Sequence, residues 1–542
     1  MTTIFAARRI LTMSPSRPDA THVAVRDGLI LGVGSLEELR GWGHSELDDR
    51  FADKVLMPGF VEGHTHLDAG AVWAHTYCGY YERIRPDGAR CPAVRTLEEV
   101  IARLAESASR AKHGKAIIGW CFDPLFMGVG LTRVELDHVS TTQPVVVIHA
   151  SGHVLYANTV ALRQAGYYEP AFRHDGLPLG TDGVPTGELK GVEVALPAAH
   201  ALGIVDVMVC RDVAAARAFG KLCVRAGVTT ATDLANPLDE HGYEVLAKAT
   251  GAADFPARIV AAIMGAGQPP VEAVDRARQL RSRSTDRLRL GMIKLVLDGS
   301  IQAFTARLLE PGYYNGAPNG LWYMAPEQVR EYLELALAAN LQVHMHTNGD
   351  QATELALDCL EAALRRHPHP DHRYTLQHAQ LSNAAQFMRM KQLGACANLF
   401  ANHIFYYGDV HAAHTVGPER AARMNACGTA LRLGVPFAMH SDEPVTPMAP
   451  LFTAWCAVNR LTASGQVLGP EQRIGVMDAL HAMTLGTAYT LHLDHEIGSI
   501  EAGKRADFAV LEEDPTRVAP ERLKDVGVWG TVLGGRPCAA IL

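Results

Sequence analysis

The residues with the clearest capacity for chemistry stand where a short apolar run ends. His64 and His66 close the run MPGFVEGHTHLD, which extends from Met57 to Asp68. Side chains two positions apart on a strand point the same way, so both imidazoles can reach one cation. Neutral imidazoles supported by a carboxylate are the usual ligands of a catalytic zinc that keeps one position open for water. Taken alone, the His-Thr-His pair is equally consistent with the cap of a turn.

Further candidate ligands end or interrupt later apolar runs, which favours a metal site over a turn cap. They are Lys294 in MIKLVLDG, His344 and His346 in LQVHMHTNGD, His378 in RYTLQHAQ, and Asp442 in VPFAMHSD. Lys294 is unusual because burying an ammonium group in an apolar strand is costly. Carbamylation by carbon dioxide would turn it into a carboxylate able to bridge two metals. An unmodified lysine would instead pair with Asp298 or reach the rim.

The pattern around these residues indicates how they could meet. From Met57 onward, strand-like apolar runs alternate with helix-like segments such as 326–340 and 352–367, in which apolar residues recur at three- and four-residue spacing. Eight such strands predict an α/β fold, a (β/α)8 TIM-type barrel, with an open doubly wound sheet as the alternative. In a barrel the C-terminal strand ends share one rim, so the candidate ligands would converge there. The strand candidates begin at Gly59, Val228, Arg258, Met292, Leu341, Arg373, Gly394 and Val435.

The two ends of the chain differ from this alternating pattern and resemble each other. Residues 1–56 and 490–542 contain short strand-like runs, and neither end has enough strands for a stable sheet alone. We therefore expect them to pair into one composite β-domain of sandwich type. The barrel would span residues 57–489, with an insertion after strand one, about residues 67–210, forming a cap over one barrel end.

Composition narrows the partners and the compartment. The chain has 542 residues, of which 48% are hydrophobic and 20% charged, and its net charge of -8 offers no basic surface for nucleic acid or an anionic membrane. No apolar run reaches the roughly 18 residues of a membrane helix, and the first residues lack a signal-peptide pattern. A cytoplasmic enzyme with a small-molecule substrate is expected, as a homodimer. The ten cysteines form no CxxC pair and are expected to be reduced, mostly buried thiols.

Several motifs together carry a family resemblance. MPGFVEGHTHLD, IKLVLDGS, HTNGDQA, QHAQLS and HSDEPVTPMAP, in this order, resemble the amidohydrolase superfamily, and within it the branch of N-substituted formamide deformylase-like enzymes (amidohydrolase 3 type). The segment GTAYTLHLDHEIGSIEAGKRADFAVLEEDP is similar to the part of that family that returns to the β-domain. The resemblance covers essentially the whole chain. It implies a metal-dependent hydrolase acting on carbon-nitrogen bonds other than peptide bonds.

The resemblance also implies a set of site residues. Six residues would hold two divalent metal ions: His64, His66 and Asp442 for one ion, His346 and His378 for the other, and carbamylated Lys294 between them. His344 is set aside because the Gly-Asp motif that follows the family's histidine matches His346. Zinc is the first expectation, with iron, manganese or cobalt as alternatives. A metal-bound hydroxide would attack the carbonyl, and Asp442 would accept its proton and pass it to the leaving amine.

The cap and the loops are expected to contact the substrate, through Trp120, His153, Ser300 and Arg307. His153 in SGHVLYAN matches a cap histidine that faces the substrate in relatives, and a surface histidine at a helix start is the alternative. The substrate would be an amide or N-acyl compound, with N-formyl as the narrower expectation.

Two other functions compete with this hydrolysis. A mononuclear aminohydrolase (deaminase) of a ring amidine normally has a glutamate a few residues from the strand-five histidine, and HMHTNGD offers none. A catalytically silent scaffold would have lost ligands, whereas all six ligand positions are occupied.

Overall fold

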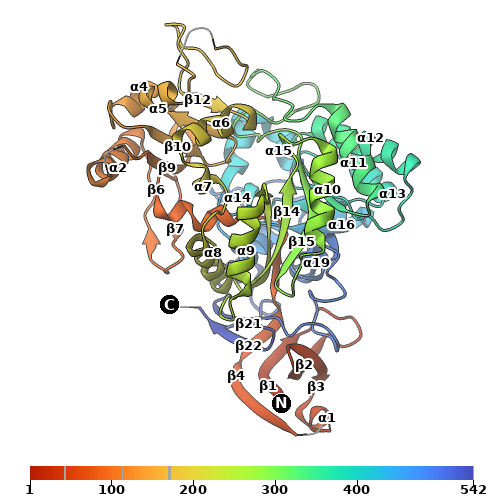
Figure 1. Ribbon diagram of the computed structural model, residues 1–542. Coiled ribbons are helices and arrows are strands. Elements are labelled where there is room, and N and C mark those ends of the chain that lie inside the picture. The colour runs from red at the N-terminus through yellow and green to blue at the C-terminus, as the bar shows by residue number, and fades with distance from the viewer. Residues whose placement is uncertain (42–43, 113, 169–171, 541–542) are drawn as a thin grey trace.

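The central element of the computed structural model, which describes residues 1–41, 44–112, 114–168 and 172–540, is an eight-stranded parallel sheet (Figure 1). Its strands, in spatial order, are β5 (Phe60–Glu62), β13 (Val228–Asn236), β14 (Arg258–Met264), β15 (Leu288–Val296), β16 (Gln342–Thr347), β17 (Thr375–His378), β18 (Cys396–Leu399) and β19 (Phe437–Met439). Each strand pairs in parallel with its neighbour. The barrel-type α/β fold expected from the alternating pattern is confirmed.

Side chains tie the first and last strands of the barrel together. The backbone N–H and the hydroxyl of Ser441 donate to the two carboxylate oxygens of Glu62, each over 2.9 Å. The N–H of Asp442 donates to the carbonyl of His64 over 3.0 Å. Burial raises the pKa of Glu62 to about 8, and the two bonds from Ser441 oppose that rise. The seam therefore fixes the end of β19 against the end of β5, where candidate ligands lie.

Helices surround the barrel because each presents one apolar stripe to the strands. In the helix at residues 350–366, the buried Ala352, Ala356, Leu360 and Ala363 recur every three or four positions. The helical segments expected at 326–340 and 352–367 are both present. The helices that follow the barrel strands are α8 (Val213–Ala226), α9 (Glu240–Gly251), α10 (Pro270–Arg281), α11 (Pro326–Ala338), α12 (Asp350–Arg366), α13 (Ala384–Leu393), α14 (Asn402–Val410), α15 (Gly417–Arg423), α16 (Cys427–Leu433), α17 (Pro450–Asn459), α18 (Val476–Ala482) and α19 (Leu485–Thr490).

A second sheet combines strands from both ends of the chain, at the bottom of Figure 1. Its order is β22 (Arg536–Ala539), β21 (Val528–Leu533), β20 (Phe508–Leu511), β4 (Ser45–Pro58), β1 (Thr2–Leu11), β2 (Asp19–Arg26) and β3 (Leu29–Gly34), with α1 (Leu36–Arg40) beside it. A separate core fills it, in which Phe5, Val25 and Phe51 pack with Phe508 and Val532. Strands from the N-terminal and C-terminal parts therefore share one hydrophobic core.

The segment between β5 and α8 forms a third unit that contains its own sheet. The sheet order is β12 (Glu188–Lys190), β11 (Val154–Ala157), β10 (Val145–His149), β9 (Ile117–Phe122) and β6 (Thr76–Tyr77), and a small hairpin pairs β7 (Arg83–Ile84) with β8 (Arg90–Cys91). Its helices are α2 (Leu97–Arg110), α3 (Pro124–Met127), α4 (Arg133–Asp137), α5 (Thr159–Gln164), α6 (Val192–Leu202) and α7 (Val205–Met208). This unit lies at the upper left of Figure 1, beside the barrel rim.

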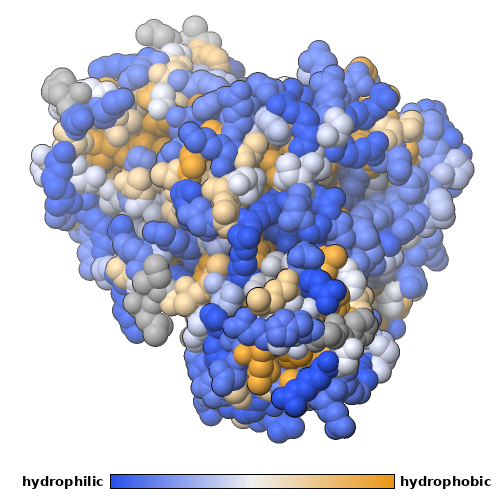
Figure 2. Space-filling model, turned by 60° about the horizontal axis from the view of Figure 1, so that its bottom comes forward, coloured by the Kyte–Doolittle hydropathy of each residue, from blue (hydrophilic) through white to orange (hydrophobic). Residues whose placement is uncertain are grey.

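Hydrophilic side chains cover most of the face shown in Figure 2, and apolar side chains gather mainly at the upper left and in the lower part of the view. Among the described residues, every helix is too short or too polar to cross a membrane. All ten cysteines are free and seven are buried, as expected from their spacing.

Candidate active site

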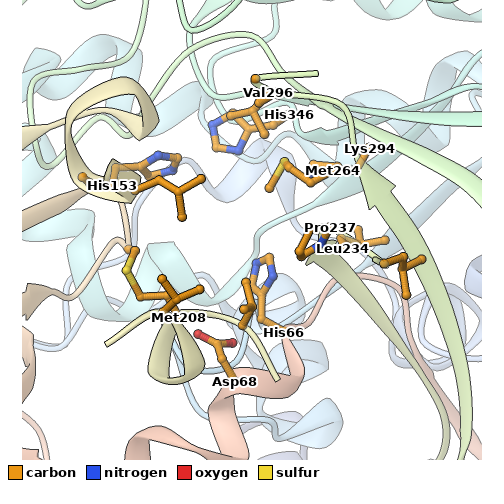
Figure 3. A pocket seen from close by; sticks show the side chains of 18 of the residues that line it. His66, Asp68, His153, Met208, Leu234, Pro237, Met264, Lys294, Val296 and His346 are labelled. Atoms are coloured by element: carbon orange, nitrogen blue, oxygen red, sulfur yellow. The ribbon is translucent and has the colours of Figure 1, made fainter. Parts of the chain in front are cut away.

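The six predicted ligands all line one cavity of about 1020 Å³, which opens between the barrel rim and the segment after strand one. His66, Lys294 and His346 are seen in its wall in Figure 3. The ring centroid of His378 lies 4.5 Å from that of His64 and 4.5 Å from that of His346. Strand ends that are more than 300 residues apart in sequence thus bring their imidazoles into contact.

Asp442 gathers the two histidines of strand one. Its Oδ1 lies 3.1 Å from Nε2 of His66 and 3.5 Å from Nε2 of His64. Burial would raise the pKa of this carboxyl, yet the bond from His66 and the charges around it hold the pKa below its usual value. The backbone of Asp442 is left-handed, with φ of 56°, a conformation that costs a non-glycine residue of the order of 1–3 kcal/mol. The seam to His64 holds it there and aims the carboxylate into the site.

His346 and His378 form the second pair. Nδ1 of His346 lies 3.0 Å from Nε2 of His378. Nε2 of His346 lies 3.1 Å from the carbonyl oxygen of Gly299, which can only accept a hydrogen bond. Nε2 also lies 3.0 Å from the amide nitrogen of Asn348, which can only donate, while Nδ1 faces His378. His378 also has a left-handed backbone, with φ of 66°.

Lys294 is buried between these pairs, with Nζ 3.4 Å from Nε2 of His64. Burial lowers its pKa to about 7, because the apolar surroundings disfavour the ammonium form. Asp298 is not turned toward this amine: its oxygens accept N–H bonds from Arg307, Asn348 and Gly349 over 2.9, 3.0 and 2.9 Å. A pairing of Lys294 with Asp298, one of the two alternatives to carbamylation, is therefore not what holds the lysine.

A chain of hydrogen bonds below the site fixes the protonation of His64. The carbonyl of Thr490 accepts from Nε2 of His344 over 3.1 Å, which leaves Nδ1 of His344 as the acceptor. The amide nitrogen of Gln377 donates to that atom over 2.6 Å, and its Oε1 lies 2.7 Å from Nδ1 of His64. Nδ1 of His64 therefore carries the proton. Its Nε2 lone pair faces Asp442.

The buried ring nitrogens that lack hydrogen-bond partners are suited to binding a cation. Within the described part of the chain, Nδ1 of His378 and both ring nitrogens of His440 are buried and lack a hydrogen-bond partner. His64, His66 and Asp442 place one ligand atom each within 4.8 Å of one another, and so do His64, His378 and His440. Imidazole and carboxylate groups are the ligands that zinc and related metals prefer. The donor set is thus suited to a divalent metal.

The four residues expected to contact the substrate are divided by the structure. Trp120 and His153 line the cavity, and the ring of His153 lies 5.0 Å from that of His346. Ser300 and Arg307 are not among the described residues that line it. The guanidinium of Arg307 instead donates to Gln351 and to the carbonyl of Gly320, and the N–H of Ser300 donates to Thr305.

Several residues of the site carried too weak a signal to be selected from the sequence. His440 stacks on His64 with ring centroids 4.9 Å apart, and its only signal in the sequence is its place two positions before Asp442. Gln377 directly precedes His378, and a polar residue inside a short buried strand is the signal that could have identified it. Asp68 lines the cavity two positions after His66, where burial raises its pKa to about 7.

The chain is similar in sequence to known proteins over nearly its whole length. The model of the amidohydrolase family matches residues 52–539. The chain is 29% identical to the protein LONG AFTER FAR-RED 3 of Arabidopsis thaliana, over 97% of this chain and 90% of that one. It is 26% identical to the N-substituted formamide deformylase of Arthrobacter pascens, over 97% and 96% of the two chains.

A solved structure shares the fold across nearly the full length. It is an uncharacterized metal-dependent hydrolase from Pyrococcus horikoshii, which is 23% identical and superposes with a TM-score of 0.73. The similarity covers 96% of this chain and 99% of that one.

Proposed function

The chain belongs to the amidohydrolase family, and on that premise we propose that it hydrolyses an amide or N-acyl carbon-nitrogen bond of a small molecule with the help of bound divalent metal. The observation that carries this proposal is the convergence of His64, His66, His346, His378, Lys294 and Asp442 on one cavity. Unpartnered donor atoms and a carboxylate at the end of a barrel strand are what metal-assisted hydrolysis requires.

Asp442 is the proposed proton carrier of the reaction. A bound divalent metal supplies Lewis acidity, which polarises a carbonyl and lowers the pKa of a water to about 7. Oδ1 of Asp442 faces the two histidines of strand one, whereas Oδ2 lies 3.8 Å from Nδ1 of His378. Asp442 takes a proton from the attacking water on a carboxylate oxygen and delivers it to the leaving nitrogen. Its lowered pKa keeps it ionised, and so able to accept that proton, at neutral pH.

Lys294 is proposed to act as a carbamate. A neutral amine is needed for the reaction with carbon dioxide, and the pKa of about 7 makes a large share of this amine neutral near pH 7. The carbamate replaces a buried cation by an anion, and the neighbouring metals neutralise it. We propose that the site holds two metal ions, with zinc as the first choice. His64, His66 and Asp442 would bind one ion, and His346 and His378 would bind the other.

N-formyl compounds are the proposed narrower class of substrate. The support is the 26% identity to an N-substituted formamide deformylase over nearly the whole of both chains. Deamination of a ring amidine is the second candidate, and the residues after His346 disfavour it. Asn348 stands there, its amide donating to the carbonyl of Gly299 over 2.8 Å, and it cannot transfer protons as a carboxylate does.

The proposal is tested by metal removal and a substrate panel. The protein is stripped with a chelator, reloaded with zinc, manganese, iron or cobalt, and assayed on N-formyl, N-acetyl, carbamate, cyclic amide and ring amidine compounds. We expect amine release from an N-formyl or N-acyl compound that vanishes on stripping and returns on reloading. Ammonia release from the ring amidine alone, or amine release that is insensitive to stripping, would overturn the proposal.

A further inference from the structure

Asp68 offers a carboxylate to the cavity beside the candidate ligand His66, and we propose that it binds a positively charged N–H group on the amine part of the substrate. Suitable groups are an ammonium, an amidinium or a guanidinium. The inference rests on the proposed function only in taking the ligand to be the amine part of an amide. It deepens that function by naming what the amine carries besides the reacting nitrogen.

The side chain of Asp68 faces the cavity, between Met208 and His66 in Figure 3. Its Oδ1 is buried, and none of the described residues gives it a hydrogen bond. A buried carboxylate oxygen without a donor costs free energy, and native proteins seldom retain one without a reason. A donor on a ligand would remove that cost.

The backbone around Asp68 is held firmly on the cavity wall. Asp68 lies in a short 3-10 helix, Leu67–Gly70, which is closed by bonds from Ala69 to the carbonyl of His66 (3.1 Å) and from Ala71 to the carbonyl of Asp68 (2.7 Å). A Cβ on Gly70 would come within 1.9 Å of the carbonyl oxygen of Ala215 in α8. The helix is therefore pressed against α8, which fixes the direction of the Cα–Cβ bond of Asp68.

The cationic side chains of the cavity wall are engaged elsewhere. Arg211 forms an ion pair with Asp239, and Arg276 lies 3.5 Å from Glu240 and donates to the carbonyl of Leu238 over 2.8 Å. Lys294 lies against His64. None of these three cations is paired with Asp68, so a cation from the ligand would not have to displace one of them.

The apolar wall around Asp68 strengthens the interaction of its carboxylate with a cation. Apolar side chains line the cavity nearby and along its length: Val72, Ile148, Met208, Leu234, Leu238 and Met264. In surroundings of low polarity a charge-assisted bond is stronger than in water, and a carboxylate facing a neutral apolar group loses solvation without a return. The cavity should therefore discriminate between a cationic arm and a neutral arm of the same shape.

The test compares two ligands of nearly identical shape, butylguanidinium and butylurea, in calorimetric titrations of the metal-loaded protein. Guanidinium keeps its charge and has no free lone pair for a metal, so a carboxylate of the cavity wall is the kind of group that can tell the two apart, and the Asp68→Asn variant shows whether that carboxylate is Asp68. We expect butylguanidinium to bind at least about tenfold more tightly, as one charge-assisted bond implies. Asp68→Asn should bring the ratio to near one.

Asp275→Asn is the matched control, because Asp275 also lines the cavity but pairs with Arg278 at an exposed position. The ratio should survive in this variant. Metal content should be equal in the parent and both variants, which separates ligand recognition from an effect on His66. A ratio near one in the parent, a ratio that persists in Asp68→Asn, or a loss of metal in that variant would overturn the inference.

Failure of this inference is distinguishable from failure of the proposed function. Metal-dependent amide hydrolysis without a preference for the cation would leave the proposed function in place and remove the role of Asp68. An Asp68-dependent preference in a protein that hydrolyses no amide would do the reverse.

Discussion

Oε1 of Gln377 lies 2.7 Å from Nδ1 of His64, and this contact decides which nitrogen of a candidate ligand is free. Gln377 is itself oriented by Asn398, whose amide donates to the same oxygen over 2.8 Å. An amide oxygen carries no proton and can only accept, so Nδ1 of His64 donates to it and the lone pair of His64 remains on Nε2. Gln377 thus holds His64 in the tautomer whose Nε2 can bind a metal ion.

We expect Gln377→Leu to lower metal affinity or activity by about 10–100-fold, because losing an outer partner of a ligating histidine typically costs that much. The measurement is metal titration of the stripped protein, followed by turnover. Gln380→Leu is the control, since Gln380 is as buried and donates to His403 instead of to a candidate ligand. Equal loss in both variants would show a packing defect and contradict the role of Gln377.

His66→Ala should lower turnover by more than about 100-fold and reduce bound metal, because a ligand matters more than its outer partner. The imidazole of His66 extends into the cavity rather than into the barrel core, so the fold should persist. Metal analysis and circular dichroism check both statements. Activity within a few-fold of the parent would remove His66 from the metal site.

Reconstitution of stripped protein with metal and carbon dioxide should depend on pH through Lys294. Its pKa in the fold is about 7, below the ordinary value of 10.5, so the reactive neutral amine dominates above pH 7 and the ammonium form below it. At a fixed concentration of dissolved carbon dioxide, the rate should fall about tenfold per unit below pH 7 and level off above it. A rate that keeps rising about tenfold per unit between pH 7 and about pH 9 would contradict the lowered pKa.

Lys294→Ala should hold about one metal ion fewer per chain and turn over slowly. A short carboxylate such as acetate or propionate should restore part of the rate, because it can occupy the space that the carbamate leaves. Metal analysis with and without the carboxylate is the measurement. Full activity and full metal content in Lys294→Ala would exclude the bridge.

Stability should depend on a buried ion pair between the barrel and the terminal sheet. Arg258 in β14 binds both oxygens of Asp507, over 2.7 and 3.1 Å, and Asp507 also accepts from the N–H of Gly534 over 2.7 Å. Arg258 keeps its ion pair with Asp286 over 2.8 Å in Asp507→Ala, so the variant should lose only the charge-assisted bonds of Asp507, about 1.5–3 kcal/mol of the free energy of unfolding.

Chemical denaturation measures this loss. Asp254→Ala is the control, because Asp254 pairs with Arg217 at the surface, where an ion pair contributes about 0–1 kcal/mol. A loss below about 1 kcal/mol in Asp507→Ala would show that the buried pair is not what holds the two sheets together.

The barrel could be predicted because its signals are local. Apolar runs such as those around Lys294 and His346 alternate with amphipathic helices, and each run ends in a polar residue that a barrel must bring to one rim. The sheet and the strand ends that carry the candidate ligands follow from that periodicity, whereas the choice of the ligand set comes from the family resemblance.

The parts that escaped prediction depend on contacts between distant segments. Nothing near Asp442 in the sequence shows the left-handed backbone that aims it, because the seam to His64 imposes that conformation. Arg307 resembles a substrate contact by its place in a loop, yet Gln351, from the helix after the next strand, takes its guanidinium. The role of Gln377 is visible only in the folded structure, where its side chain lies between those of His344 and His64.

The sheet shared by both ends of the chain also sets an order of events during synthesis. β4 ends at Pro58, and its neighbour β20 begins at Phe508, so about 450 residues emerge between the two. At roughly 5–20 residues per second, the first strands wait about 20–90 seconds for the partner that completes their core. Throughout that interval Phe5 and Phe51 lack Phe508 and Val532, and one edge of β4 is open to pairing with other chains. The N-terminal strands are thus the part of the nascent chain where a holding chaperone would be most useful, because binding there would block pairing with other chains.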